Sequence, residues 1–436
     1  MKLNYKRTIL IGFAFLSICA FWQFYDNEIP KILKYRFNLG ETATGAIMAL
    51  DNVFALFLLP FFGNLSDKTE SKLGKRMPYI IIGTALSVSL LYILIAVAGN
   101  SGSLPLFIGI LLLLLVSMGI YRSPAVSLMP DLTPAPLRSS GNAIINLMGT
   151  LGGIFVLVMT KVLLKEAENP ADTDYMPFVT SIIICMVISI GILYKTVKEN
   201  KLRKEIEELG GLNSLGEELE EEHKEAGDAA AAIPSDVKRS LLFLLLSVFF
   251  WYTAYNAITT AFSRFVGEVW DLHNNEYATC LLVATVAATL SYIPIAFISG
   301  KIGRKKTILA GIALMAASYV ITGFYPHFSA SINIFFALVG VGWAAINVNS
   351  YPMVVEMCKT GEIGKYTGTY YTFSMAAQVF TPVFSGYLLE HISYRTLFPY
   401  AFIFSGLAFF TMLMVKHGDT RPDMKGKLLE NFDVDD

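Results

Sequence analysis

Long apolar runs, separated by short polar connections, recur along the whole chain of 436 residues. Each run holds about 20 mostly apolar residues, the length that an α-helix needs to cross the hydrocarbon core of a bilayer. No segment shows the two-residue alternation of a half-buried strand. The pattern therefore predicts an all-α membrane protein with twelve spans, over residues 8–27, 41–63, 78–98, 104–125, 139–161, 177–195, 240–264, 276–299, 307–325, 331–354, 364–388 and 396–416.

The composition agrees with a lipid environment and excludes several other classes of protein. The chain is 54% hydrophobic and only 16% charged, against about a quarter charged in soluble proteins. Its net charge of −1 gives no basic surface for nucleic acid. The sequence has no glycine-rich phosphate loop, nucleophile elbow or metal-ligand cluster, and its four cysteines lie far apart. We therefore expect no cofactor, no bound metal and no enzymatic activity.

Lysine and arginine residues concentrate at both termini and in the even-numbered connections. Positive residues stay on the cytoplasmic side, so we expect a cell-membrane protein with both termini in the cytoplasm. The N-terminal run resembles a secretory leader, but it ends in FWQFYDNE rather than in small cleavage-site residues, so we interpret it as the first span. Glu28 and Pro30 then fall at the outer membrane surface.

The two sets of six spans repeat each other. Trp22 and Asn27 recur as Trp251 and Asn256, at a spacing of 229 residues. A polar, acidic stretch lies between the two sets. We interpret it as a solvated linker, with a docking role as the alternative. The predicted domains are a first half (1–196), a connector (197–238), a second half (239–418) and a tail (419–436).

Two segments carry a resemblance to a known family. The stretch GNLSDKTESKLGKRMPYIIIG, Gly63 to Gly83, resembles the loop between helices 2 and 3 of major facilitator transporters. Its extended form is similar to that of the glycoside/pentoside/hexuronide cation symporters and of the related sucrose and maltose proton symporters. The stretch YRSPAVSLMPDLTPAPLRSSGNAIINLMG, Tyr121 to Gly149, resembles the region of helices 4 and 5 in the sucrose-type members. The resemblance implies the major facilitator fold, in two six-helix halves, and cation-coupled uptake of a sugar.

The loop between helices 2 and 3 combines an acid with several bases, and we interpret it as a conformational latch. Acids and bases at helix ends can bind the partial charges of other helix termini in one state and release them in another. The alternative is that the bases only hold the loop in the cytoplasm. The second-half copy, GKIGRKK, lacks the aspartate, so we expect an asymmetric latch. The predicted gating residues are Gly63, Asp67, Gly74, Arg76, Asp131, Arg304 and Glu356.

Asp51 lies about ten residues from either end of the second apolar run, near the bilayer centre. A charge there costs about 2.5–3.5 kcal/mol on insertion scales, so the carboxylate is expected to face a cavity, to be paired or to be protonated part of the time. We predict that Asp51 couples transport to a cation, with Asp26 as a second candidate. The alternative is a structural acid bonded to Asn52. In the melibiose-type branch helix 2 carries a D-x-x-x-D sodium motif, but Ala55 stands at its second position here, which favours protons over sodium.

Arg122 is the one strong base at membrane depth, and a guanidinium can hold a carboxylate or sugar hydroxyls. Its alternative role is to reach the cytoplasmic surface and meet Asp131. Sugars need polar partners and flat apolar faces, although a single aromatic residue can equally serve packing. The predicted substrate-binding residues are Gln23, Asn27, Asn52, Arg122, Asn142, Asn146, Trp251, Tyr255, Asn256, Trp343, Asn347, Tyr370 and Gln378.

These observations together predict a monomeric secondary transporter that imports a sugar or glycoside, a disaccharide in the first instance, with a proton as the coupled ion. The alternatives within transport are sodium coupling, or an uncoupled carrier of another small organic solute. A non-transporting membrane sensor with the same fold would need a signalling domain, and the connector is too poor in apolar residues to fold alone.

Overall fold

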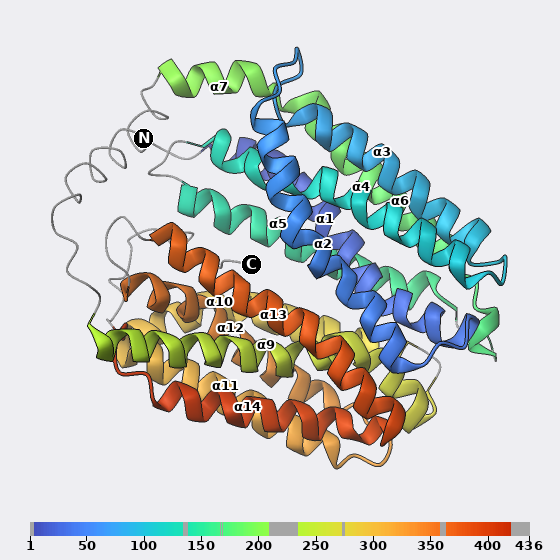
Figure 1. Ribbon diagram of the computed structural model, residues 1–436, viewed down its shortest axis with the longest axis vertical. Coiled ribbons are helices and arrows are strands. Elements are labelled where there is room, and N and C mark those ends of the chain that lie inside the picture. Colours follow the sequence, from blue (N-terminus) through green and yellow to red (C-terminus); the bar gives the residue numbers. More distant parts are fainter. Residues whose placement is uncertain are drawn as a thin grey trace. The chain divides into compact units, whose positions relative to one another are not determined.

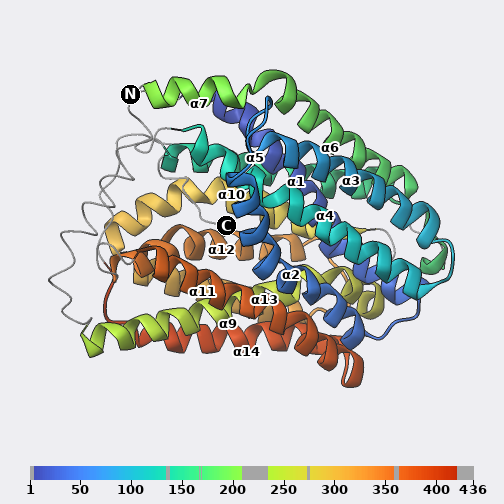
Figure 2. The ribbon, with the colours of Figure 1, turned by 45° about the horizontal axis from the view of Figure 1, so that its top comes forward.

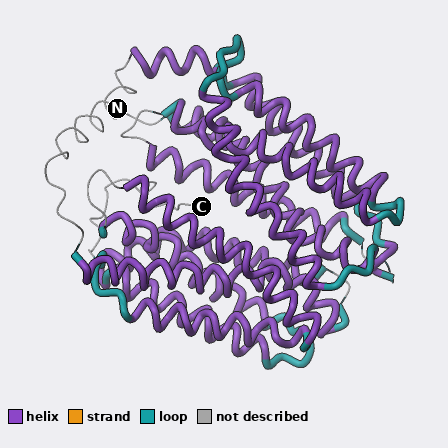
Figure 3. The backbone as a smooth tube through the Cα atoms, in the orientation of Figure 1, coloured by secondary structure: helices purple, strands orange, loops and turns teal. Residues whose placement is uncertain are grey.

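The computed structural model describes residues 4–133, 138–165, 167, 169–208, 234–272, 275–357 and 363–419. All regular structure in these residues is helical (Figure 3), and thirteen α-helices account for most of it. The chain divides into two compact units: Met1–Leu212 with Asp271–Leu282, and Asn213–Trp270 with Val283–Asp436. We describe each unit by itself.

The first unit contains six long helices and one short one (Figure 1). Proline in the first turn of α3, α4 and α6 suits the start of a helix, because the first N–H groups have no intrahelical partner. Five-residue π-helical segments, η1 (Ile32–Arg36) and η2 (Leu94–Ala98), extend α1 and α3. The α-helices are α1 (Tyr5–Lys31), α2 (Glu41–Asp67), α3 (Met77–Ile93), α4 (Leu104–Asp131), α5 (Arg138–Leu163), α6 (Met176–Thr196) and α7 (Glu199–Glu208).

Helix α1 lies at the centre of this unit, where it packs mainly against α5 and α6, while α3 packs against α4 and α6 (Figure 2). The aromatic side chains of Phe21 and Phe24 on α1 are fully buried in its core. A Cβ atom at Gly152 of α5 would lie 2.1 Å from the backbone oxygen of Leu16 on α1. Small residues let membrane helices approach this closely and gain packing energy. The α1–α5 contact therefore depends on glycine at position 152.

The second unit also contains six long helices. Helix α9 packs against α13 and α14, and α11 packs against α12 and α14. Residues 276–282 of α10 belong to the first unit and the remainder of that helix to the second. The helices are α9 (Ser235–Trp270), α10 (Glu276–Ile302), α11 (Arg304–Gly323), α12 (Ile332–Glu356), α13 (Ile363–His391) and α14 (Leu397–Leu413).

Eleven helices in the described part of the chain are long and apolar enough to cross a membrane. The remaining predicted run, 364–388, lies within α13, which is 29 residues long. Large apolar side chains such as Phe57 and Leu290 are about 70% exposed, which fits a surface that faces lipid. The prediction of an all-α membrane protein is confirmed.

The predicted domain boundaries differ slightly from the two compact units and stay a prediction. The beginning of the connector, as α7, and the beginning of α10 both belong to the first unit. Residues 209–233 of the connector, residues 420–436 of the tail and Cys358 lie outside the described residues. Cys185 and Cys280 are free thiols.

Candidate functional site

A charged cluster lies inside the first unit, where α1, α2 and α4 bring together Asp26, Asp51 and Arg122. Both carboxylates are partly buried. Asp26 interacts electrostatically with Asp51 and with Arg122, and Asp51 also interacts with Arg122. The side chain of Asn52 donates a hydrogen bond of 2.8 Å from Nδ2 to Oδ1 of Asp51. Three residues that the sequence analysis selected separately thus form one cluster of two acids and one base.

Arg122 also lies against an aromatic ring. Its guanidinium carbon lies 5.4 Å from the centre of the Trp22 ring, within the range of a cation–π interaction. The Trp22 ring itself packs edge-on against Phe21 and Tyr25, at centroid distances of 5.1 and 5.4 Å. Asp131, the alternative partner of Arg122, forms its ion pairs with Lys75 and Arg76 instead. Trp22 was not among the substrate-binding residues predicted from the sequence.

The remaining candidates in the first unit are arranged along α1 and α5. The side-chain amide of Asn27 donates to the backbone oxygen of Gln23, 2.7 Å away, and Asn27 is buried. Gln23 points toward α5, where its Oε1 would lie 3.3 Å from a Cβ at Gly153. Asn142 and Asn146 follow each other by one turn on α5 and are partly exposed. Their roles in substrate binding stay predictions.

The second unit holds an aromatic stack with buried polar atoms around it. Tyr255 of α9 stacks on Trp343 of α12, with ring centres 3.8 Å apart and planes 5° from parallel. On the same two helices, Nε1 of Trp251, Nδ2 of Asn256 and Oδ1 of Asn347 are buried polar atoms without a hydrogen-bond partner among the described residues. Unsatisfied buried polar groups are costly, and a bound ligand is one way to satisfy them.

Tyr319 of α11 is a candidate that sequence reasoning missed. Its side chain is 1% exposed, its hydroxyl has no hydrogen-bond partner among the described residues, and it interacts electrostatically with Tyr255. A single tyrosine in an apolar helix gives no signal in the sequence. Tyr370, by contrast, is bonded through its hydroxyl to Ser350 at 3.0 Å and is fully buried, while Gln378 is partly exposed on α13.

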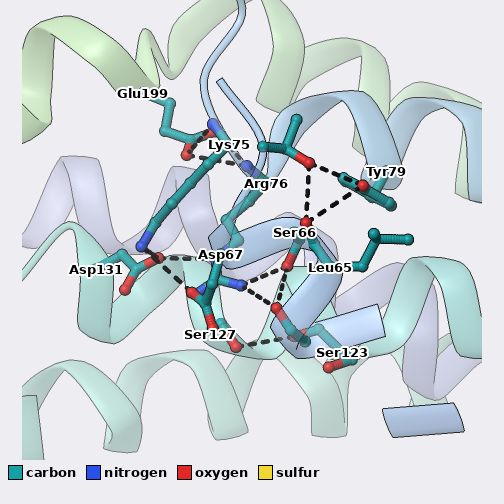
Figure 4. A network of polar contacts seen from close by, with 12 residues as sticks. Leu65, Ser66, Asp67, Lys75, Arg76, Tyr79, Ser123, Ser127, Asp131 and Glu199 are labelled. Carbon is teal, nitrogen blue, oxygen red and sulfur yellow. Dashed lines mark hydrogen bonds and ion pairs between the residues drawn. The ribbon is translucent and has the colours of Figure 1, made fainter. Parts of the chain in front are cut away.

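A second polar network surrounds Arg76 at the start of α3 (Figure 4). The Arg76 guanidinium donates to Asp67, to the hydroxyl of Ser66 and to the backbone oxygen of Gly63. It also donates from Nε to Asp131 at the end of α4, over 2.8 Å. Lys75 adds ion pairs of 3.1 Å to Asp131 and 3.5 Å to Asp67. The predicted gating residues of this half therefore join the ends of α2, α3 and α4.

Glu199, at the start of α7, completes this network and was missed by the sequence analysis. Its carboxylate accepts hydrogen bonds of 2.9–3.1 Å from the backbone N–H groups of Lys75, Arg76 and Met77, which open α3. An acid at a helix N-terminus satisfies unpaired N–H groups and the partial positive charge there. Gly74 makes this possible: its φ is +117°, and a Cβ would lie 2.2 Å from Oε2 of Glu199.

The second unit repeats this arrangement with different residues. Arg304 at the start of α11 forms an ion pair with Glu356 at the end of α12, and both are among the predicted gating residues. Asp419, which follows α14, accepts a 2.8 Å hydrogen bond from the backbone N–H of Lys305. Gly303 precedes this site with a φ of +94°, as Gly74 does in the first unit. The two networks are more alike than the loop sequences indicate, because Asp419 comes from a distant part of the chain.

Helical units that repeat each other, with charged side chains buried at membrane depth, are typical of membrane transporters. A comparison with protein families identifies the group. The model of the Major Facilitator Superfamily matches residues 8–273 and 244–431, and the chain therefore belongs to this superfamily. It is a transporter and not an enzyme.

Individual relatives are more distant. The chain is 26% identical to the raffinose carrier protein of Pediococcus pentosaceus over 211 residues. This alignment covers 43% of this chain and 33% of the carrier. It is 29% identical over 207 residues to a putative tartrate transporter of Agrobacterium vitis, 45% of each chain. The chain thus matches less than half the length of these curated relatives. The inward open structure of the xylose transporter XylE from E. coli covers 98% of both chains with a TM-score of 0.65 and 16% identity, which is a likeness of fold.

Proposed function

We propose that this transporter imports a sugar or glycoside, with a disaccharide as the first candidate, by proton symport and alternating access. The proposal places it among the glycoside/pentoside/hexuronide cation symporters, in the cell membrane, as a monomer with both termini in the cytoplasm. The observation that carries it is the cluster of Asp26, Asp51 and Arg122 in the spanning helices of the first unit.

The charge balance of this cluster supports a neutral solute with a cation. Two ionised carboxylates exceed the one guanidinium by a single negative charge, and a bound cation would neutralise that excess. An uncompensated charge at this depth is costly, so binding of the cation and closure of the site would favour each other. A dicarboxylate such as tartrate would add two further negative charges beside Asp26 and Asp51. The raffinose carrier is therefore a better guide to the solute than the tartrate transporter.

The polar groups of the second unit support a solute rich in hydroxyls. Sugar hydroxyls both donate and accept hydrogen bonds, and the unsatisfied atoms of Trp251, Asn256 and Asn347 include donors and an acceptor. The Tyr255–Trp343 stack offers flat apolar surface of the kind that packs on the C–H faces of a sugar ring.

Proton coupling is favoured over sodium coupling by the surroundings of Asp51. The side-chain amide of Asn52 donates a hydrogen bond to Asp51 and so occupies one of its carboxylate oxygens. A metal ion needs several oxygen ligands, and the second acid of the sodium motif is replaced by Ala55, a buried apolar residue. A proton needs only one carboxylate.

The test is uptake of labelled sucrose, maltose and raffinose into proteoliposomes under an imposed proton or sodium gradient. We expect Asp51→Asn to abolish accumulation against a gradient but to retain exchange of labelled for unlabelled sugar, because the neutral amide mimics a permanently protonated acid. Asp172→Asn, at an exposed acid outside the spans, is the matched control. Accumulation by Asp51→Asn equal to that of the parent would refute coupling through Asp51.

A further inference from the structure

The hydroxyl of Tyr25 on α1 is a buried polar group to which neither the Arg76 network nor the aromatic stack of the second unit assigns a role. The Tyr25 side chain is 1% exposed, and its oxygen has no hydrogen-bond partner among the described residues. A hydroxyl buried without a partner costs free energy, so its presence calls for an explanation.

Aromatic rings hold Tyr25 beside the cluster of Asp26, Asp51 and Arg122. The Tyr25 ring stacks on Phe21, with centroids 6.0 Å apart and planes at 25°, and it meets the Trp22 ring edge-on at 5.4 Å. Tyr25 also interacts electrostatically with Asp51 and, less strongly, with Asp26. The ring is therefore packed among apolar groups, while the hydroxyl lies in the field of two carboxyl groups.

Other charged groups near Tyr25 have partners of their own. Glu28 lies one turn further along α1, and the structure buries it, although the sequence placed it at the outer surface. Its carboxylate makes an ion pair of 2.9 Å with Lys31 and accepts a hydrogen bond from the hydroxyl of Tyr277. Arg122 lies over the Trp22 ring.

The helices that pack on α1 from the other side bring no charge to this position. Helices α5 and α6 carry their charged residues at their ends: Arg138, Lys161 and Lys195. Cys185, in the middle of α6, interacts electrostatically with Tyr121. Asp51 and Asp26 are therefore the acids that Tyr25 faces in the described part of the chain, with Asp51 the stronger partner.

A tyrosine hydroxyl both donates and accepts, so it can bond a carboxyl group in either protonation state. The bond to the ionised state is the stronger one, because a charge-assisted hydrogen bond is roughly twice as strong as a neutral one. A hydrogen bond to the charged form of an acid favours that form. A hydrogen bond from Tyr25 would therefore stabilise Asp51 after its proton has left.

The helix contacts allow this hydrogen bond to form and to break. Helix α1 approaches α5 closely at Gly152, whereas α2, which carries Asp51, packs mainly against α4. A small shift of α2 therefore changes the separation of Tyr25 and Asp51 without loss of the contact between α1 and α5.

We propose that Tyr25 is a positioning residue for proton release, whose hydroxyl donates to the Asp51 carboxylate once the proton has passed to water. The proton moves from a carboxyl oxygen of Asp51 to a water molecule, and the O–H bond of Tyr25 stays intact. No other group changes its protonation in this step. The inference rests on the proposed coupling of transport through Asp51.

Infrared spectroscopy of the purified transporter tests this role without any solute. The C=O stretching band of a protonated carboxyl group is lost when the acid ionises, and Asp51→Asn identifies the part of the band that belongs to Asp51. In Tyr25→Phe we expect that part to disappear at a pH higher than in the parent by roughly 0.4–1.1 pH units, the value of one hydrogen bond. The shift is upward because loss of the donor destabilises the carboxylate more than the neutral acid.

Two further variants separate the hydroxyl from the ring. Tyr121→Phe is the matched control, because the hydroxyl of this buried tyrosine donates to the backbone oxygen of Ala14 over 2.8 Å. It should leave the Asp51 band unchanged. Site-specific replacement of Tyr25 by a ring-fluorinated tyrosine, a stronger donor, should move the band to lower pH. A band at the parental pH in both Tyr25 variants, with both proteins folded by gel filtration, would overturn the proposal.

The infrared outcomes also distinguish this role from the proposed function. If the Asp51 band titrates in the parent and does not respond to the changes at Tyr25, the positioning role is refuted and coupling through Asp51 stands. If Asp51→Asn removes no titrating band, coupling through Asp51 and the role of Tyr25 are refuted together.

Transport supplies a second measurement. Net uptake of labelled sucrose under a proton gradient requires release of the proton in every cycle, whereas exchange of labelled for unlabelled sucrose does not. We expect Tyr25→Phe to slow net uptake by roughly 2- to 10-fold, because the released state loses its hydrogen bond, and to leave exchange at the parental rate. Equal slowing of net uptake and exchange would assign Tyr25 to the packing of α1 and contradict a role in proton release.

Discussion

The role of Arg122 depends on which side chains lie next to it. From the sequence it could face the acids within the membrane or reach Asp131 at the cytoplasmic end, and both distances are possible for a long side chain. In the structure, Asp131 forms ion pairs with Lys75 and Arg76 and not with Arg122. The Arg122 guanidinium lies over the Trp22 ring and interacts electrostatically with Asp26 and Asp51. A planar cation that stacks and donates in several directions fits this position better than a point charge.

Arg122→Lys therefore tests the cluster at constant charge. The ammonium keeps the positive charge but loses the planar fork and much of the stacking on Trp22. We expect the KM for sugar uptake to rise by about 10-fold, which corresponds to about 1.4 kcal/mol. Lys161→Arg, which preserves an ion pair elsewhere in the first unit, should leave KM unchanged. A parental KM for Arg122→Lys would show that the cluster needs only charge.

Trp251 allows the binding and structural roles of a residue to be separated. Its indole N–H is buried without an acceptor among the described residues, so Trp251→Phe removes no protein hydrogen bond. We expect the thermal unfolding midpoint to fall only slightly, through lost packing, and the KM for sugar to rise roughly 2- to 10-fold, the value of one hydrogen bond. Trp270→Phe is the control, because that indole donates to the backbone oxygen of Tyr325 and should act on stability alone. A large fall in the unfolding midpoint of Trp251→Phe with an unchanged KM would instead assign Trp251 a role in packing.

The positions of the helices could largely be predicted from the sequence, but the residues that cap their ends could not. Apolar runs located the helices because lipid requires backbone groups to be bonded within each segment. Helix ends were less accurate: α9 covers Ser235–Trp270, well beyond the predicted 240–264, because its polar ends extend past the apolar core of the membrane. Glu199 caps the start of α3, although it lies 122 residues after Met77 in the chain. No local sequence pattern predicts a partner so far away.

The cap on α3 gives a prediction at this scale. Gly74 and Gly102 both have positive φ, but a Cβ would clash with Glu199 at Gly74 and would meet nothing within 4 Å at Gly102. Both alanine variants carry the backbone strain, and only Gly74→Ala also displaces the carboxylate. We expect Gly74→Ala to be the less stable of the two by roughly 1–3 kcal/mol, measured as the free energy of unfolding in detergent. Equal stabilities would mean that Glu199 adapts without loss of its hydrogen bonds.

Across the whole molecule, the same electrostatic arrangement occurs once in each unit. Arg76 with Asp131 and Glu199 corresponds to Arg304 with Glu356 and Asp419, so the internal repeat seen in the sequence extends to helix ends that the sequence did not connect. What the sequence could not supply was the partner of each charge, since these contacts join helices that are far apart along the chain. The solute-binding residues depend on the same kind of information.

The orientation of the molecule can be tested independently of transport. Positive residues predict that the loop 68–76 is cytoplasmic and that the loop 99–103 is outside. Alkaline phosphatase, which is active only outside the cytoplasm, should therefore be active when fused after Ser101 and inactive when fused after Lys72. The reverse pattern of activities would invert the proposed topology.

The division of α10 between the two units has a consequence for how the chain is made. A ribosome delivers the first six spans well before residue 271, yet the first unit is incomplete until residues 271–282 have been synthesised. Until then the end of α1 presents Glu28 and Lys31 without Tyr277, and α5 lacks its contacts with Asn275 and Glu276. We therefore expect the packing of the first unit to be completed only after residues 271–282 have been synthesised, so that assembly of the two halves overlaps in time.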